Sequence, residues 1–213
     1  MNIQFSNVIP VPLSSIQPKA DSIWRADFSI QSGEKILLNA ASGKGKTTFT
    51  HLLMGIRSDY SGDIFFNGKN IDSMMLDEWM LIRKNKIAVV YQDLQLFPEL
   101  TAFENVIIKN QLTQVLTINE IEFMFEQVGL IDKRKQIAAT LSMGQKQRVA
   151  IIRALCQPFE WLILDEPFSH LDNENREICF KIISESCSMN NAGMILTSLD
   201  EMDISDFDKQ LKL

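Results

Sequence analysis

Two short stretches of the chain combine residue types that could bind and hydrolyse a nucleotide. The first, AASGKGKTT, spans residues 40–48. Gly43 and Gly45 allow successive backbone N–H groups to curl around an anion. Lys46 can reach terminal phosphates, and the Thr47 hydroxyl can bind magnesium at the start of the helix that follows. This stretch therefore predicts a phosphate-binding loop.

The second stretch, EWLILDEP at 160–167, ends an apolar run with two carboxylates. Ligands of open α/β sheets bind at the carboxyl ends of the strands, where this pair would lie. Asp165 is placed to hold magnesium, directly or through water, and Glu166 to polarise an attacking water. Together with the glycine-rich loop, the pair is typical of nucleotide hydrolases of the phosphate-loop class.

Alternating strands and helices are expected to position both stretches. The apolar run 35–40 predicts a strand that leads into the phosphate loop. After the loop, the spacing of four apolar residues predicts one face of a helix: Phe49, Leu52, Leu53 and Ile56. Further buried strands are predicted at 86–93, 160–167 and 193–198, and a helix at 173–189. This order predicts a mostly parallel sheet with crossover helices.

Two segments are expected to lie outside that sheet. Within 61–71, Gly62 and the Asn67-Gly68 pair bracket a short strand, which predicts a β-hairpin. From 101 to 140 the pattern is helical, and Thr117 with Glu120 forms a capping-box signal.

Composition restricts the class of protein. With 46% hydrophobic residues, the 213-residue chain can bury a substantial core. No apolar run approaches the roughly 18 residues that span a bilayer, and the start lacks a signal-peptide pattern, so we expect a cytoplasmic protein. The net charge of −6 argues against a sequence-independent grip on nucleic acid. Cys156, Cys179 and Cys187 have no metal-site spacing and are expected to be buried, reduced thiols.

Further motifs resemble those of ATP-binding cassette (ABC) ATPases. LSMGQKQRVAIIRAL (141–155) resembles their signature motif, and VVYQDLQLFPELTAFENV (89–106) resembles their glutamine loop. The resemblance runs from Ile23 to Asp200 and includes SIQSGEKILLNA, SGDIFFNGKNI and EPFSHLD. It implies an α/β fold with a RecA-like P-loop NTPase core, a small antiparallel β subdomain and an inserted α-helical subdomain.

The same resemblance divides the chain. It implies one ABC ATPase domain over 1–213, with the core and β subdomain in 1–92 and 141–213 and the helical subdomain in 93–140.

In this family two nucleotide-binding domains enclose two ATP molecules, with the phosphate loop of one chain facing the signature of the other. The resemblance implies that ATP is bound within one chain by Ala40, Ser42, Gly43, Lys44, Gly45, Lys46, Thr47 and Thr48. The implied Mg2+ ligands are Thr47, Gln92 and Asp165, and the implied catalytic residues are Glu166 and Gln92. Across the interface the implied contacts are Ser142, Gly144, Gln145 and Asp172. Ser142 is also placed to cap the helix that carries Val149, Ile152 and Leu155.

Three residues depart from the family pattern. Ala40 replaces a glycine, which is tolerable if its φ stays negative. Met143 replaces the first glycine of the signature and would place a side chain at the interface. Leu199 stands where a histidine usually contacts the γ-phosphate, and leucine cannot donate that hydrogen bond. Loss of one charge-stabilising group costs about 10²- to 10³-fold in rate, so we expect ATP binding with slow to moderate hydrolysis.

Several other residues have less specific interpretations. The aromatic residue that stacks on adenine in the family would fall near Gln17, and Trp24 and Phe28 are expected to be core residues instead. His51 is expected to be a packed or rim residue. His170 is expected to be either an interface contact or solvent-exposed.

The sequence of one stretch most resembles the lipoprotein-release, cell-division and macrolide-export group of ABC ATPases: RKNKIAVVYQDLQLFPELTAFENV. It implies a homodimer or heterodimer that powers an integral membrane permease from the inner face of the cell membrane, with no nucleic acid partner. A helix over 72–80 is expected to pack its Met and Trp face, and a patch near Phe97 and Leu100 could receive the permease. The alternatives are a non-transport ABC ATPase that transmits force to a membrane partner, and a degenerate ATP-binding subunit with weak hydrolysis.

Overall fold

A five-stranded parallel sheet forms the centre of the computed structural model, which describes residues 1–15, 19, 21–39, 43–198 and 204–213. The strand order is β6-β7-β8-β3-β9. The strands are β3 (Lys35–Asn39), β6 (Ile87–Val90), β7 (Trp161–Asp165), β8 (Gly193–Ser198) and β9 (Lys209–Lys212). The four predicted strands and their parallel arrangement are confirmed, and β9 is an edge strand that was not predicted.

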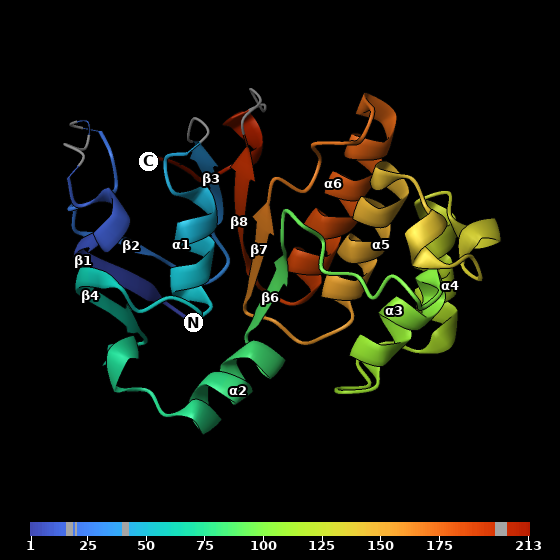
Figure 1. Ribbon diagram of the computed structural model, residues 1–213, viewed down its shortest axis with the longest axis horizontal. Helices are drawn as coiled ribbons and strands as arrows, with labels where there is room; N and C mark the ends of the chain where they lie inside the picture. Colours follow the sequence, from blue (N-terminus) through green and yellow to red (C-terminus); the bar gives the residue numbers. More distant parts are fainter. Residues whose placement is uncertain (16–18, 20, 40–42, 199–203) are drawn as a thin grey trace.

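Helices cover both faces of this sheet (Figure 1). They are α1 (Lys46–Leu53) on one face and α5 (Met143–Leu155) and α6 (Asn173–Met189) on the other. Side chains alternate along each strand, so Trp161 and Ile163 of β7 pack with α1, whereas Leu162 and Leu164 pack with α5 and α6. One detail of the predicted α1 face is wrong, because the helix ends at Leu53 and Ile56 beyond it is 55% exposed.

The second sheet is antiparallel, with the order β2-β1-β4-β5. Its strands are β1 (Ile3–Pro10), β2 (Phe28–Ile30), β4 (Tyr60–Phe66) and β5 (Lys69–Asn70). The predicted hairpin is confirmed: Asn67 and Gly68, with φ of 49° and 80°, form the turn between β4 and β5. Gly62, however, lies inside β4.

Helix α2 (Leu76–Asn85) follows this sheet and corrects the expectation for 72–80. Trp79 is buried against Phe66, but Met75 and Met80 are 71% and 53% exposed. Trp79 and Ile82 are three residues apart and share the inward face, whereas Met80 is rotated away from it. Met75 and Met80 are therefore surface residues, whereas Met74, just before the helix, is half-buried and packs against the core as predicted.

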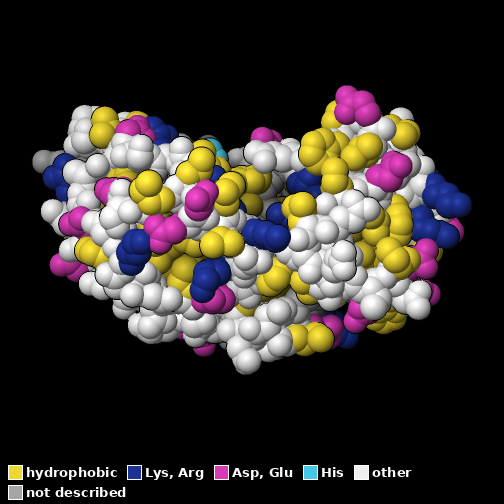
Figure 2. All heavy atoms as spheres, turned by 90° about the horizontal axis from the view of Figure 1, so that it is seen from below, with side chains coloured by type: hydrophobic (Ala, Val, Ile, Leu, Met, Phe, Trp, Pro, Cys, Tyr) yellow, Lys and Arg dark blue, Asp and Glu magenta, His cyan; other side chains and the backbone are white. Residues whose placement is uncertain are grey.

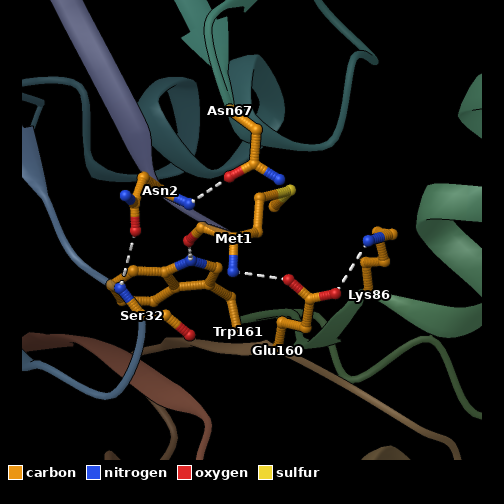
Figure 3. Close-up of polar contacts among 7 residues, drawn as sticks. All are labelled: Met1, Asn2, Ser32, Asn67, Lys86, Glu160 and Trp161. Carbon is orange, nitrogen blue, oxygen red and sulfur yellow. Dashed lines mark hydrogen bonds and ion pairs between the residues drawn. The ribbon is translucent and has the colours of Figure 1, made fainter.

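A polar network fastens β1 to the start of β7 (Figure 3). The buried Trp161 indole donates from Nε1 to the carbonyl oxygen of Met1 at 2.6 Å. The amine of Met1 lies 2.5 Å from Glu160 Oε2, and Lys86 Nζ lies 2.7 Å from Glu160 Oε1. The two sheets are thus joined by hydrogen bonds and ion pairs as well as by apolar packing.

The helical part of the fold lies beside α5 (Figure 1). It holds α3 (Ala102–Asn110) and α4 (Ile118–Gln127), and Thr117 and Glu120 form the predicted capping box of α4. The 3-10 helices are η1 (Val11–Leu13), η2 (Ile71–Ser73), η3 (Ile131–Lys133), η4 (Ala138–Thr140) and η5 (Ile204–Asp206). The domain boundaries at 93 and 140 stay a prediction. No helix within the described ranges has both the length and the apolar character needed to cross a membrane.

Candidate active site

The phosphate loop leads directly into α1, whose N-cap is Gly45. Gly45 has a φ of 101°, and a Cβ there would lie 2.9 Å from Leu13 Cδ1 and 3.2 Å from the Trp24 ring. Trp24 Nε1 donates to the Lys44 carbonyl at 3.3 Å, which holds the loop against the buried indole. Gly43 also has a positive φ, of 76°. Only glycine satisfies both the torsion and the close approach at position 45.

Lys46, which follows this loop at the start of α1, forms an ion pair with Glu166, the residue directly after β7. The Nζ to Oε1 distance is 3.1 Å, and the two side chains are only 6% and 10% exposed. Gln92, just beyond β6, donates from Nε2 to Glu166 Oε2 in a long hydrogen bond of 3.4 Å. Three predicted site residues from separate segments therefore meet at the carboxyl edge of the parallel sheet.

Asp165 ends β7 with only 1% of its surface exposed. Burial raises the pKa of its carboxyl above the usual value, and the charge of Glu166 adds to this, while hydrogen bonds from the Thr197 and Thr47 hydroxyls act in the opposite direction. Thr197 donates to Oδ1 at 2.8 Å. Oδ2 is buried and has no well-aligned hydrogen bond from the described residues.

This arrangement fits a magnesium ion. A buried carboxylate oxygen that lacks a donor can be satisfied by a cation or its bound water. The nearby donors, Asp165 and the Thr47 hydroxyl, are both oxygen ligands, which Mg2+ prefers. One carboxylate and one hydroxyl are typical of sites where substrate phosphates complete the coordination.

The signature helix α5 begins as predicted. Ser142 Oγ accepts from the Gln145 backbone N–H at 3.3 Å, and Gln145 Oε1 accepts from the Ser142 N–H at 2.9 Å, so the two residues form a capping box. Met143 is 44% exposed at this end. A Cβ on Gly144 would lie 2.7 Å from the carbonyl oxygen of His170, so this end of α5 packs against the segment after Glu166.

Gln147 is a site residue that the sequence analysis did not identify. It is 1% exposed, and its Nε2 donates to Ser169 Oγ at 2.8 Å and reaches the Glu166 carbonyl at 3.5 Å. Its Oε1 accepts from the His170 N–H at 3.0 Å. The sequence does contain one signal for this role. Gln147 lies four residues before the apolar Ile151, so it shares the face of the helix that is expected to be buried. Gln147 joins helix α5 to the segment that follows β7.

The remaining predicted residues occupy varied places. Asp172 is the N-cap of α6, where hydrogen bonds from Asn175 hold its pKa below the usual value. The His170 side chain is exposed and shares a 2.9 Å hydrogen bond with Ser169. His51 is half-buried beside the Tyr91 ring.

The aromatic predictions are confirmed in part, since Trp24 is buried whereas Phe28 is half-buried and stacks on Phe5. The predictions for Gln17, Ala40, Ser42 and Leu199 lie outside the described residues.

A phosphate loop, a buried acidic pair and a glutamine at one edge of a parallel sheet define the class of P-loop nucleotide-binding proteins. The model of the ABC transporter family matches residues 24–169 of the chain. The chain belongs to this family, as an ATP-binding subunit of an ABC transporter.

Curated relatives agree with this family, and a solved structure agrees with the fold. The chain is 35% identical over 178 residues to the lipoprotein-releasing system ATP-binding protein LolD of Buchnera aphidicola subsp. Acyrthosiphon pisum, covering 81% of this chain and 77% of that relative. It is 30% identical over 191 residues to the LolD protein of Psychrobacter arcticus, covering 88% and 84%. The dimeric structure of MJ0796, a bacterial ABC transporter cassette, matches with a TM-score of 0.80 at 23% identity, covering 99% of this chain and 94% of that chain.

Proposed function

We propose that the chain binds ATP together with Mg2+ and hydrolyses it at the edge of the parallel sheet. The observation that carries this proposal is the buried pairing of Lys46 with Glu166, next to Asp165 Oδ2, which has no well-aligned donor in the part of the chain that the structure describes. Lys46 exchanges its carboxylate partner for the terminal phosphate, and this releases Glu166 to accept a proton from the attacking water. When bound, Mg2+ neutralises charge on the phosphate oxygens. Asp165 and Thr47 would hold it.

Residues at the signature end of α5 would complete the site of a second chain. Ser142 and Met143 are exposed there, and the positive end of a helix favours an anionic partner. Ser142, Gly144 and Gln145, with the Asp172 loop, are therefore proposed to contact ATP across a homodimer or heterodimer. The exposed Met143 would weaken closure of that dimer. This weaker closure and Leu199 together are proposed to make hydrolysis slow to moderate.

A groove of about 520 Å³ is the proposed docking site of a membrane permease. Its lining is Met54, Arg83, Ile87, Val89, Tyr91, Gln95, Phe97, Ile108, Lys109, Leu112, Arg153, Ala154 and Gln157. Figure 2, a view from below, shows lysine and arginine side chains among hydrophobic ones on the face that holds α2 and α3. Arg83, Lys109 and Arg153 bring positive charge to this otherwise largely apolar lining, so the groove favours a partner that combines apolar and acidic groups. Burial, and then the neighbouring charge of Arg153, lowers the pKa of Lys109, and an acidic partner would oppose that shift.

Arg153 links this groove to the catalytic site. Its guanidinium donates to the carbonyl oxygens of Leu94 and Gln95 at 2.6 and 2.7 Å, in the loop that also carries Gln92. A permease segment in the groove would therefore press on the loop that carries Gln92. Because the curated relatives are named as lipoprotein-releasing proteins, we propose lipoprotein release as the transport reaction, with the chain on the inner face of the cell membrane.

ATP hydrolysis by the purified chain, beside Glu166→Gln and Leu199→His variants, tests the catalytic proposal. We expect magnesium-dependent hydrolysis that the glutamine variant loses and the histidine variant raises. Binding of ATP without hydrolysis in all three would overturn the proposal for the chain alone and favour the degenerate subunit. In vesicles that hold the chain and a permease, ATP-driven release of a membrane-anchored lipoprotein tests the transport reaction.

A further inference from the structure

Thr197 is a buried polar residue in the apolar strand β8, and it bonds to both acidic residues of the site. Its side chain is 0% exposed. Its Oγ1 donates to Asp165 Oδ1 at 2.8 Å and accepts from the Glu166 backbone N–H at 3.1 Å. A hydroxyl has one proton and two lone pairs, so one side chain can make both bonds at once.

The first bond fixes the rotation of the Asp165 carboxylate. Oδ1 is occupied by the Thr197 hydroxyl, whereas Oδ2 is buried and lacks an aligned donor within the described residues. The oxygen left over for a cation is thus determined by Thr197. Without the Thr197 hydroxyl, the Asp165 carboxylate could rotate and either of its oxygens could face the cation.

The second bond supports an unusual backbone turn. Glu166 has a φ of 51°, in the left-handed region that non-glycine residues rarely adopt. In this turn its carboxylate reaches both Lys46 and Gln92. The hydrogen bond from its N–H to Thr197 compensates for the strained torsion at a functional position.

We propose that Thr197 is a positioning residue for magnesium-dependent ATP hydrolysis, which presents Asp165 Oδ2 to the ion and aims the Glu166 carboxylate. This inference rests on the proposed ATPase function. Partners that orient a ligand from outside the coordination shell change metal affinity or activity by about 10- to 100-fold when they are removed.

The test compares Thr197→Val, which keeps the shape and removes the hydroxyl, with Thr197→Ser, which keeps the hydroxyl. We expect the valine variant to lose about 10- to 100-fold in kcat and to need more Mg2+ for half-maximal activity. Its affinity for the ATP analogue AMP-PNP in EDTA should be unchanged, while the gain in affinity on adding Mg2+ should shrink. The serine variant should behave like the unaltered chain in both assays.

Thr50→Val is the matched control, because Thr50 is also fully buried and its hydroxyl has no hydrogen-bond partner in the described structure. It should leave both assays unchanged. A valine variant at position 197 that retains normal kcat and Mg2+ response would overturn the proposal, and so would a serine variant as impaired as the valine one. Should the valine variant not fold, Thr197→Ala takes its place. If the unaltered chain proves unable to hydrolyse ATP, the proposed function fails, but the Mg2+ dependence of AMP-PNP binding still decides the role of Thr197.

Discussion

Lys46 Nζ lies 3.1 Å from Glu166 Oε1, so the cation of the phosphate loop pairs with the carboxylate of the acidic pair. Both side chains are largely buried, and a buried ion pair stabilises a fold only weakly because both charges lose their hydration. The pair matters for function because Lys46 must exchange its carboxylate partner for a phosphate when a nucleotide binds. A phosphate that takes Lys46 must displace Glu166, which couples nucleotide binding to release of the proposed base.

This exchange predicts that Glu166→Gln binds ATP more tightly than the unaltered chain while hydrolysing it far more slowly. The neutral amide competes less well for Lys46, whereas loss of a general base costs about 10²- to 10⁴-fold in rate. Equilibrium binding and steady-state hydrolysis, both with Mg2+, measure the two effects. Glu185→Gln on the exposed side of α6 is the control and should change neither. Weaker ATP binding by the Glu166 variant would contradict the exchange.

Gly45→Ala should abolish ATP binding and lower stability. The substitution places a Cβ at a φ of 101°, within 2.9 Å of Leu13 and 3.2 Å of Trp24. A left-handed alanine alone costs roughly 1–2 kcal/mol, and the contacts add to that. Gly68→Ala is the matched control, since its φ is 80° but the space around it is open. Thermal unfolding should show a loss in both variants and nucleotide binding a loss only at position 45, so equal binding by the two would contradict the argument.

The sequence was sufficient to predict a site residue wherever one short stretch contained both the backbone requirement and the reactive side chain. The glycines before Lys46 and the acidic end of β7 were recognisable for that reason, and apolar runs marked the four predicted strands β3, β6, β7 and β8. Strand β9 was missed because Lys209, Gln210, Leu211 and Lys212 contain no apolar run. Its pairing with β3 makes this segment a strand.

The roles of Gln147 and Thr197 could not be predicted, because each depends on hydrogen bonds between elements far apart in the chain. The bonds of Gln147 reach Ser169 and His170, and those of Thr197 cross from β8 to β7. The exposed face of α2 shows the converse. Helical spacing identified the segment, but only packing against Phe66 decided that Trp79 and not Met80 faces inward.

Gln147→Leu should slow hydrolysis and destabilise the fold. The leucine would leave the partly buried His170 N–H without its acceptor, at a cost of about 1–3 kcal/mol, and would free the backbone that follows Glu166. Chemical denaturation and kcat report the two effects. Gln111→Leu, at an exposed position just after α3, should change stability by less than about 0.5 kcal/mol. Normal kcat in a destabilised Gln147 variant would show that its role is structural alone.

The three cysteines should be unreactive in the folded protein. Cys156, Cys179 and Cys187 are free and buried as predicted, and burial raises the pKa of each thiol to about 12. Titration with a thiol-exchange reagent near pH 8 should detect no thiol in the native chain and all three in denaturant. Since the unfolded chain loses these protons first, the free energy of unfolding should fall as the pH rises above about 8.5. Fast labelling of any of the three in the native state would contradict their burial.

The last prediction concerns the groove that is proposed to receive the permease. Leu112 lines it and is 59% exposed, so Leu112→Asp should prevent assembly with the permease by placing a hydrated carboxylate in an apolar contact. ATP hydrolysis by the isolated chain should be unchanged, because the groove residue touches no part of the acidic pair. The measurement is co-purification of the chain with its permease in detergent.

Phe123→Asp provides the matched control for this prediction. Phe123 on α4 is 57% exposed, which is close to the value for Leu112, but it does not line the groove. If the groove receives the permease, only the Leu112 variant should lose its partner. Equal loss in both variants would mean that the permease rests on a wider apolar surface of the helical part. Retention in both would exclude the groove as the docking site. The exposed residues of α2 and its N-cap, Met75, Leu76, Met80 and Leu81, would then be the surface to test next.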